Sequence, residues 1–128
     1  MSFNSSWWSV QLPSEWTITE DGQCATLSGK HFSSAFQISA ARKERGLVTD
    51  EELKDFVSER LTNNVLSQID TGLFSGFYAE RSESGVFWRE WWLCAGSLMI
   101  YASYNVDEKF KNAETSLINH IVESLKPK

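Results

Sequence analysis

The segment from Phe74 to Val106 constrains the fold of this chain more than any other. Its sequence, FSGFYAERSESGVFWREWWLCAGSLMIYASYNV, consists of three runs rich in aromatic and β-branched residues. Two turn signals separate the runs, Ser84-Gly85 and Gly96-Ser97. Short glycine-containing turns between such runs are typical of β-hairpins. The segment therefore predicts three consecutive antiparallel strands, which hold three of the six tryptophans and all three tyrosines.

If both turns are two-residue loops, the residue numbers decide which side chains face each other. Glu80 then faces Arg89, Arg81 faces Trp88, and Arg89 faces Tyr104. These oppositions are an ion pair and two cation–aromatic pairs, and both kinds stabilise neighbouring strands. The same register gives the pairs Tyr78–Trp91, Phe77–Trp92, Glu90–Ser103, Trp92–Tyr101 and Leu93–Ile100. A slip of one residue would destroy this agreement, so the sequence favours this register.

Both faces of the predicted strands become polar toward Arg89 and Glu90, whereas the opposite end is a plain hydrophobic core. The main candidate site is a polar group on one face: Arg81, Trp88, Glu90, Ser103 and Asn105. A carboxylate beside aromatic surface can bind an amine or a backbone donor, and burial can raise its pKa. The structural alternative, which is favoured, is that Arg81 and Glu90 neutralise each other diagonally above Trp88.

The other face carries a second polar group at the same end: Glu80, Arg89 and Tyr104. Here the favoured interpretation is again structural, a cross-strand ion pair capped by a tyrosine hydroxyl. Because neither face is uniformly polar, we expect the middle strand to be covered on both sides.

Four short strands precede a helix in the first half of the chain. Period-two alternation and turn residues place the strands at residues 7–12, 16–19, 24–27 and 34–41. Thr49 and Glu52 have the spacing of a capping box, and apolar residues recur at helical spacing over residues 50–66. After the meander, Asp107 is the expected N-cap of a second amphipathic helix. Its apolar residues are Phe110, Leu117, Ile121, Val122 and Leu125, and Pro127 follows its end.

This order predicts one α+β domain over residues 1–128. Strands in runs with short connections favour an antiparallel sheet, here of about seven strands, with the two main helices packed on its faces. The element order, the opening WWSVQLPSEW and the later FWREWWLCAGSLMIYASYN resemble the PsbP/Mog1-like fold. More narrowly, they resemble small bacterial domains of uncharacterised function. The resemblance implies a layered sandwich and a non-enzymatic domain that binds protein partners through its sheet or loops.

Composition excludes several functional classes. A formal net charge of −5 argues against nucleic acid as a partner. No apolar run is long enough to span a membrane, and the N-terminus lacks the pattern of a signal peptide, so we expect a cytoplasmic protein. Cys24 and Cys94 are expected to be free thiols, with a disulfide as the alternative. His31 and His120 have no metal-site spacing, and the common catalytic motifs are absent, so no metal or cofactor is expected and an enzyme is not favoured.

A protein-binding module, such as an adaptor or a chaperone, is therefore the favoured function. Tryptophan is enriched at binding hot spots, and alternation turns Trp8 inward and leaves Trp7 as the exposed candidate. One alternative is a small-molecule-binding protein or an unrecognised enzyme with a pocket near Arg89 and Glu90. Another is a structural domain whose sheet pairs with a second copy. The expected state is a monomer or a weak homodimer.

Overall fold

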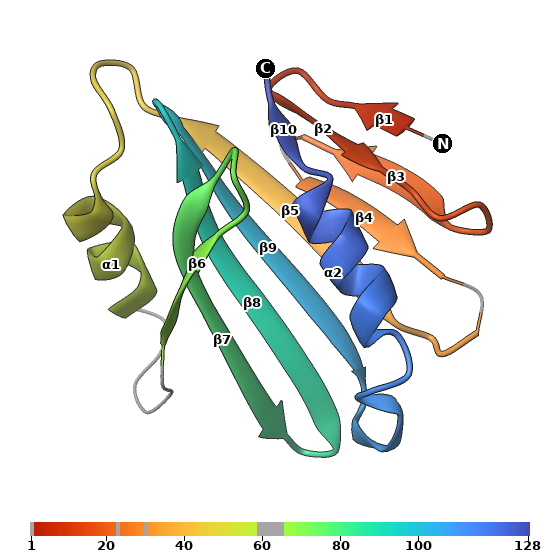
Figure 1. Cartoon of the computed structure of the whole chain (residues 1–128). Coiled ribbons are helices and arrows are strands. Elements are labelled where there is room, and N and C mark those ends of the chain that lie inside the picture. Colours follow the sequence, from red (N-terminus) through yellow and green to blue (C-terminus); the bar gives the residue numbers. More distant parts are fainter. Residues whose placement is uncertain (1, 23, 30, 59–65) are drawn as a thin grey trace.

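The computed structural model describes residues 2–22, 24–29, 31–58 and 66–128. These residues form an α+β fold with ten strands, two α-helices and one 3₁₀ helix (Figure 1). The first half holds β1 (Ser2–Asn4), β2 (Trp8–Gln11), β3 (Thr17–Asp21), β4 (Cys24–Ser28), β5 (Ala35–Arg42) and α1 (Asp50–Ser58). The second half holds β6 (Ser67–Asp70), β7 (Ser75–Glu83), β8 (Val86–Ala95), β9 (Leu98–Asp107), η1 (Glu108–Phe110), α2 (Thr115–Glu123) and β10 (Lys126–Pro127).

The described strands form two antiparallel sheets (Figure 1). The main sheet has seven strands in the order β3-β4-β5-β9-β8-β7-β6, and the small sheet has the order β1-β2-β10. β2 pairs with β1 on one side and with β10 on the other, so segments from both ends of the chain lie side by side. The meander strands β7, β8 and β9 are three adjacent strands of the main sheet.

The register of the meander is the predicted one. Glu80 lies opposite Arg89, and Arg89 lies opposite Tyr104. Ser84 and Gly85 both have positive φ angles, 52° and 80°, as the tight turn of a two-residue hairpin requires. The hairpin geometry therefore determines which side chains share a face, as the sequence indicated.

The two helices cover opposite faces of the main sheet. On one face, Leu53 of α1 packs in a cluster with Phe77 and Trp92. On the other face, Ile118 of α2 belongs to the larger core, which contains Trp91 and also takes in side chains of the small sheet. Every residue of β8 from Arg89 to Cys94 is buried, so the prediction that the middle strand is covered on both sides is confirmed.

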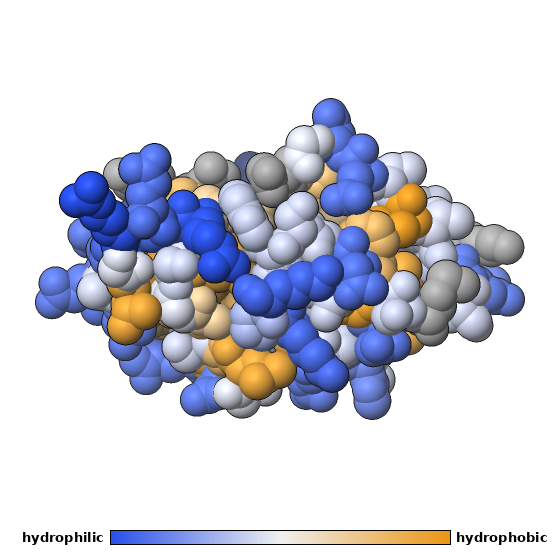
Figure 2. Space-filling model, turned by 90° about the horizontal axis from the view of Figure 1, so that it is seen from above, coloured by the Kyte–Doolittle hydropathy of each residue, from blue (hydrophilic) through white to orange (hydrophobic). Residues whose placement is uncertain are grey.

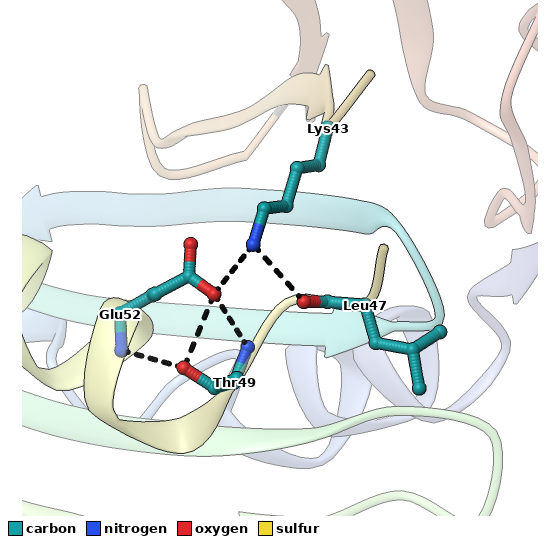
Figure 3. A network of polar contacts seen from close by, with 4 residues as sticks. All are labelled: Lys43, Leu47, Thr49 and Glu52. Atoms are coloured by element: carbon teal, nitrogen blue, oxygen red, sulfur yellow. Dashed lines mark hydrogen bonds and ion pairs between the residues drawn. The ribbon is translucent and has the colours of Figure 1, made fainter. Parts of the chain in front are cut away.

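The predicted capping box starts α1 (Figure 3). The N–H of Glu52 donates to Oγ1 of Thr49 at 3.1 Å, and the N–H of Thr49 donates to Oε1 of Glu52 at 3.2 Å. Lys43 Nζ lies 2.7 Å from the same Oε1 and 3.3 Å from the carbonyl oxygen of Leu47. The hydrogen bond from Lys43 is the main reason that the pKa of Glu52 is lowered. The segment before α1 is therefore fixed at both ends.

Several features of the fold differ from the prediction. The strand expected at residues 7–12 belongs to the small sheet, and β6, which was not predicted, completes the main sheet. Asp107 caps η1, through Oδ1 and the N–H of Lys109 at 3.1 Å, and α2 begins only at Thr115. Of the helix expected over residues 50–66, residues 50–58 are helical and residue 66 is not. The predicted helical positions 59–65 lie outside the described residues.

Candidate functional site

On the α1 face, side chains of the predicted polar group hydrogen-bond to each other. Glu90 is only 4% exposed. Its Oε1 accepts a hydrogen bond from Arg81 Nε at 3.0 Å, and its Oε2 accepts one from the Tyr101 hydroxyl at 2.5 Å. The Arg81 guanidinium lies over the ring of Trp88 at 4.8 Å and also pairs with Glu83 at 2.8 Å. The structural interpretation predicted the pairing of Arg81 with Glu90, and the hydrogen bond from Tyr101, which was not predicted, occupies the second carboxylate oxygen.

Ser103 and Asn105 share this face with the same network. Ser103 is buried opposite Glu90, and Asn105 is half-buried opposite Trp88. The structure therefore brings all five residues of the main predicted group together. They form a packed polar layer on the sheet.

On the α2 face, Arg89 is 7% exposed and lies over the rings of Tyr78 and Trp91. Its Nε donates to the Tyr78 hydroxyl and its Nη2 donates to Asn119 Oδ1, both at 2.6 Å. The Tyr78 hydroxyl in turn donates to Glu80 Oε2 at 2.5 Å. Among the described residues no direct ion pair joins Glu80 to Arg89, so the expected pair is replaced by a relay through Tyr78. Burial, followed by the bond to Glu80, raises the pKa of Tyr78 to about 12.

Tyr104 does not cap this pair either. Its hydroxyl donates to Oε1 of the buried Glu114, just before α2, at 2.7 Å, and burial raises the pKa of Tyr104. A cavity of about 190 Å³ lies beside Arg89, lined also by Tyr78 and Asn119. Ligand pockets usually have about 300–1,000 Å³, so this cavity leaves little room for a small molecule.

The remaining predicted contact residue, Trp7, is half-buried, while Trp8 is buried as alternation predicted. The Arg42 guanidinium lies 5.7 Å from the centre of the Trp7 ring. Trp7 therefore lies apart from both polar groups, and these two groups lie on opposite faces of the main sheet.

A groove of about 360 Å³ opens at the other end of β8, where the sequence suggested only a hydrophobic core. One wall is the segment before α1, with Leu47, and the other is the β6–β7 loop, with Leu73. Cys94 and Ala95 at the end of β8 also line it. Figure 2 views the molecule from this end and shows apolar side chains set among hydrophilic ones. A second hollow of about 290 Å³ shares Ser75 with the first and continues along β6 and β7.

Leu47 and Leu73 are among the few exposed large apolar side chains, with exposed fractions of 68% and 52%. Both stand on hydrogen-bonded loops. Beside Leu47, the N–H of Val48 donates to the Gly96 carbonyl at 2.9 Å, in addition to the Lys43 contact in Figure 3. Beside Leu73, the N–H of Thr71 donates to the carbonyl of Phe74 at 2.9 Å. Two fixed loops therefore hold two leucines outward on either side of one groove.

The electrostatic character of this groove is acidic. Asp50 and Asp70 line both hollows. Burial raises the pKa of Cys94, and the nearby charge of Asp50 raises it further. Sequence reasoning missed the groove. The sequence gives only a weak indication of the groove. A Gly-Leu pair followed by an apolar residue occurs in each of two otherwise polar connections, RGLVTD and DTGLFSG.

The described residues contain no cluster of three or more His, Cys, Asp or Glu side chains able to hold a metal ion. Cys24 and Cys94 are free thiols. No helix within the described part of the chain is both long and apolar enough to cross a membrane.

No protein-family model and no curated protein matches this chain. Among solved structures, a crystal structure from Bacteroides thetaiotaomicron VPI-5482 has a similar fold, with a TM-score of 0.73. The two sequences are 18% identical, and the match covers 99% of this chain and 48% of the other. The chain therefore spans about half the length of that protein, and the likeness concerns the fold alone.

Proposed function

We propose that this chain is a protein-binding module and that the groove between Leu47 and Leu73 is its docking site. One observation carries the proposal: two strongly exposed leucines flank a single groove on hydrogen-bonded loops. Burying a leucine side chain contributes about 1.5–3 kcal/mol. Loops that are already ordered lose little conformational entropy when a partner binds, so most of that free energy remains available for affinity.

The resemblance to the PsbP/Mog1-like fold supports the same proposal, because other members of that fold bind proteins. We therefore propose a non-enzymatic, PsbP/Mog1-like adaptor or chaperone of bacterial type, a monomer or a weak homodimer, with no role in nucleic-acid binding. The free thiols Cys24 and Cys94 support a reducing compartment such as the cytoplasm. The half-buried Trp7 offers further contact surface.

The small-molecule alternative rests on the cavity beside Arg89. It is the weaker proposal, because the cavity holds only about 190 Å³ and Arg89 already donates hydrogen bonds to Tyr78 and Asn119.

Comparative affinity capture from the native host tests the main proposal. The bait proteins are the wild type, the double variant Leu47→Ser/Leu73→Ser, and the control Phe110→Ser. Phe110 is the third exposed large apolar residue in the described part of the chain, with 36% exposure, and it follows β9 at the opposite end of the sheet. We expect the double variant to lose at least about a hundredfold in partner affinity, since two buried leucines are removed. The control should retain the partner. Equal recovery by all three baits would refute the proposal.

A further inference from the structure

We infer that the segment entering this groove is a short apolar stretch of a partner protein that also carries a lysine or arginine. The inference rests on the proposed function and adds the chemistry of the partner. The groove is lined by two leucines, Leu47 and Leu73, and by two carboxylates, those of Asp50 and Asp70.

The carboxylates of Asp50 and Asp70 are not neutralised within the described part of the chain. No described cation forms an ion pair with either of them. Within the described part of the chain, the Asp70 carboxylate accepts a hydrogen bond from the backbone N–H of Gly72, at 2.7 Å, and from no side chain. Lys43, the lysine of the adjoining segment, is held by Glu52 at 2.7 Å. Two exposed carboxylates that lack an ion-pair partner among the described residues favour a positively charged occupant, because electrostatic complementarity steers association.

The apolar part of the recognition surface lies beside these charges. Leu47 and Leu73 form the rim, while Phe74 and Cys94 are buried where the groove meets the core. A volume of about 360 Å³ lies at the low end of the range for ligand pockets, which suits a few side chains of a peptide. An apolar side chain between the leucines would place a neighbouring cationic side chain near Asp50 or Asp70.

Two other occupants fit less well. An anionic lipid surface would be repelled by the carboxylates and by the net charge of −5. A second copy of this chain carries the same negative charge, which opposes self-association through an acidic groove. A peptide combining leucine-like and basic residues is the occupant that complements both properties.

Selection from a phage-displayed library of random heptapeptides tests the inference. The library is panned on the wild-type protein, after depletion on the Leu47→Ser/Leu73→Ser variant. Enriched sequences should combine Leu, Ile, Val or Phe with Lys or Arg. The best of them, as labelled synthetic peptides, should bind the Asp50→Asn/Asp70→Asn variant about tenfold more weakly by fluorescence anisotropy, with affinity falling as salt rises. Glu51→Gln/Asp55→Asn, two exposed α1 carboxylates absent from the groove lining, is the matched control and should bind normally.

The outcomes separate the two proposals. If enriched peptides lack basic residues, or bind the Asp50→Asn/Asp70→Asn variant as well as the wild type, this inference is wrong and the docking site stands. If no peptide distinguishes the wild type from the double leucine variant, the docking site itself is wrong. Binding of anionic vesicles through the leucines, or a dimer that the leucine variant abolishes in light scattering, would replace the peptide with a membrane or a second copy and overturn the inference.

Discussion

Glu90 is the residue on which the polar layer of the α1 face depends. It is buried and accepts hydrogen bonds from Arg81 and Tyr101, so its removal breaks both of these hydrogen bonds. We expect Glu90→Ala to lower the free energy of unfolding by about 2–3 kcal/mol, below the full cost of breaking a buried pair because Arg81 is 30% exposed. Urea denaturation measures the change.

Glu83 is the matched control, because it pairs with the same Arg81 but its side chain is 70% exposed. Glu83→Ala should cost at most about 1 kcal/mol. Equal effects of the two substitutions would show that the Glu90 network is not structural. This end of the sheet would then again be a candidate binding site.

Cys94 gives a second prediction at the scale of single residues. Burial raises the pKa of its thiol, so at neutral pH it holds less of the reactive thiolate than an ordinary cysteine. Cys24, which is only half-buried, should react first with iodoacetamide. The rate at Cys94 should keep increasing at pH values above the usual cysteine range. Mass spectrometry of the modified peptides measures both rates, and equal rates at neutral pH would contradict this description of the groove floor.

Among the elements, β7 lies directly against the backbone of β8 at Gly76. A Cβ atom there would lie 1.8 Å from the carbonyl oxygen of Trp92, far inside any real contact. Gly76→Ala must therefore push the two strands apart, and we expect a loss of about 3 kcal/mol in unfolding free energy.

Gly22→Ala is the comparison for this prediction. That position has open space and only a left-handed backbone, with φ of 62°, so the loss should be about 1 kcal/mol. Thermal or urea unfolding of the two variants gives the comparison. If Gly76→Ala were as stable as the wild type, the register of β7 and β8 would be incorrect.

The elements differ in how well they could be predicted from the sequence. The meander was predicted pair by pair because its glycine turns fix the register and its aromatic pairs agree with it. β6 was missed because Ser67–Asp70 has only one apolar residue, and its place at the sheet edge depends on pairing with β7. Asp107 was assigned to the wrong helix because a three-residue 3₁₀ turn uses the same cap as a long helix.

For the candidate site, alternation identified which polar residues share a face, but it could not show which hydrogen bonds they make, such as those of Glu90 with Arg81 and Tyr101. Nη1 of the buried Arg89 has no hydrogen-bond partner among the described residues. The groove could not be predicted from the sequence for a different reason. Leu47 and Leu73 lie in separate connections, and only the pairing of β6 with β7 and the seating of α1 bring these two loops to one end of the sheet.

At the scale of the whole molecule, the two ends of the main sheet differ in what they offer a partner. Toward Arg89 and Glu90, charged side chains are engaged by neighbouring residues on both faces. Toward Gly96, loops present exposed leucines beside Asp50 and Asp70, which have no ion-pair partner among the described residues. We therefore propose that recognition occurs at the loop end, whereas the polar end stabilises the sheet.

Site-specific photo-crosslinking in the native host tests this claim most directly. The photoreactive residue p-benzoylphenylalanine replaces Leu73 in the groove, Trp88 on the polar layer, or Phe110 at the far end of the sheet, one at a time. If the docking site lies between Leu47 and Leu73, we expect a partner adduct from position 73 that disappears when Leu47→Ser is added. We expect no adduct from positions 88 or 110. An adduct formed through position 88 and not through position 73 would contradict this claim.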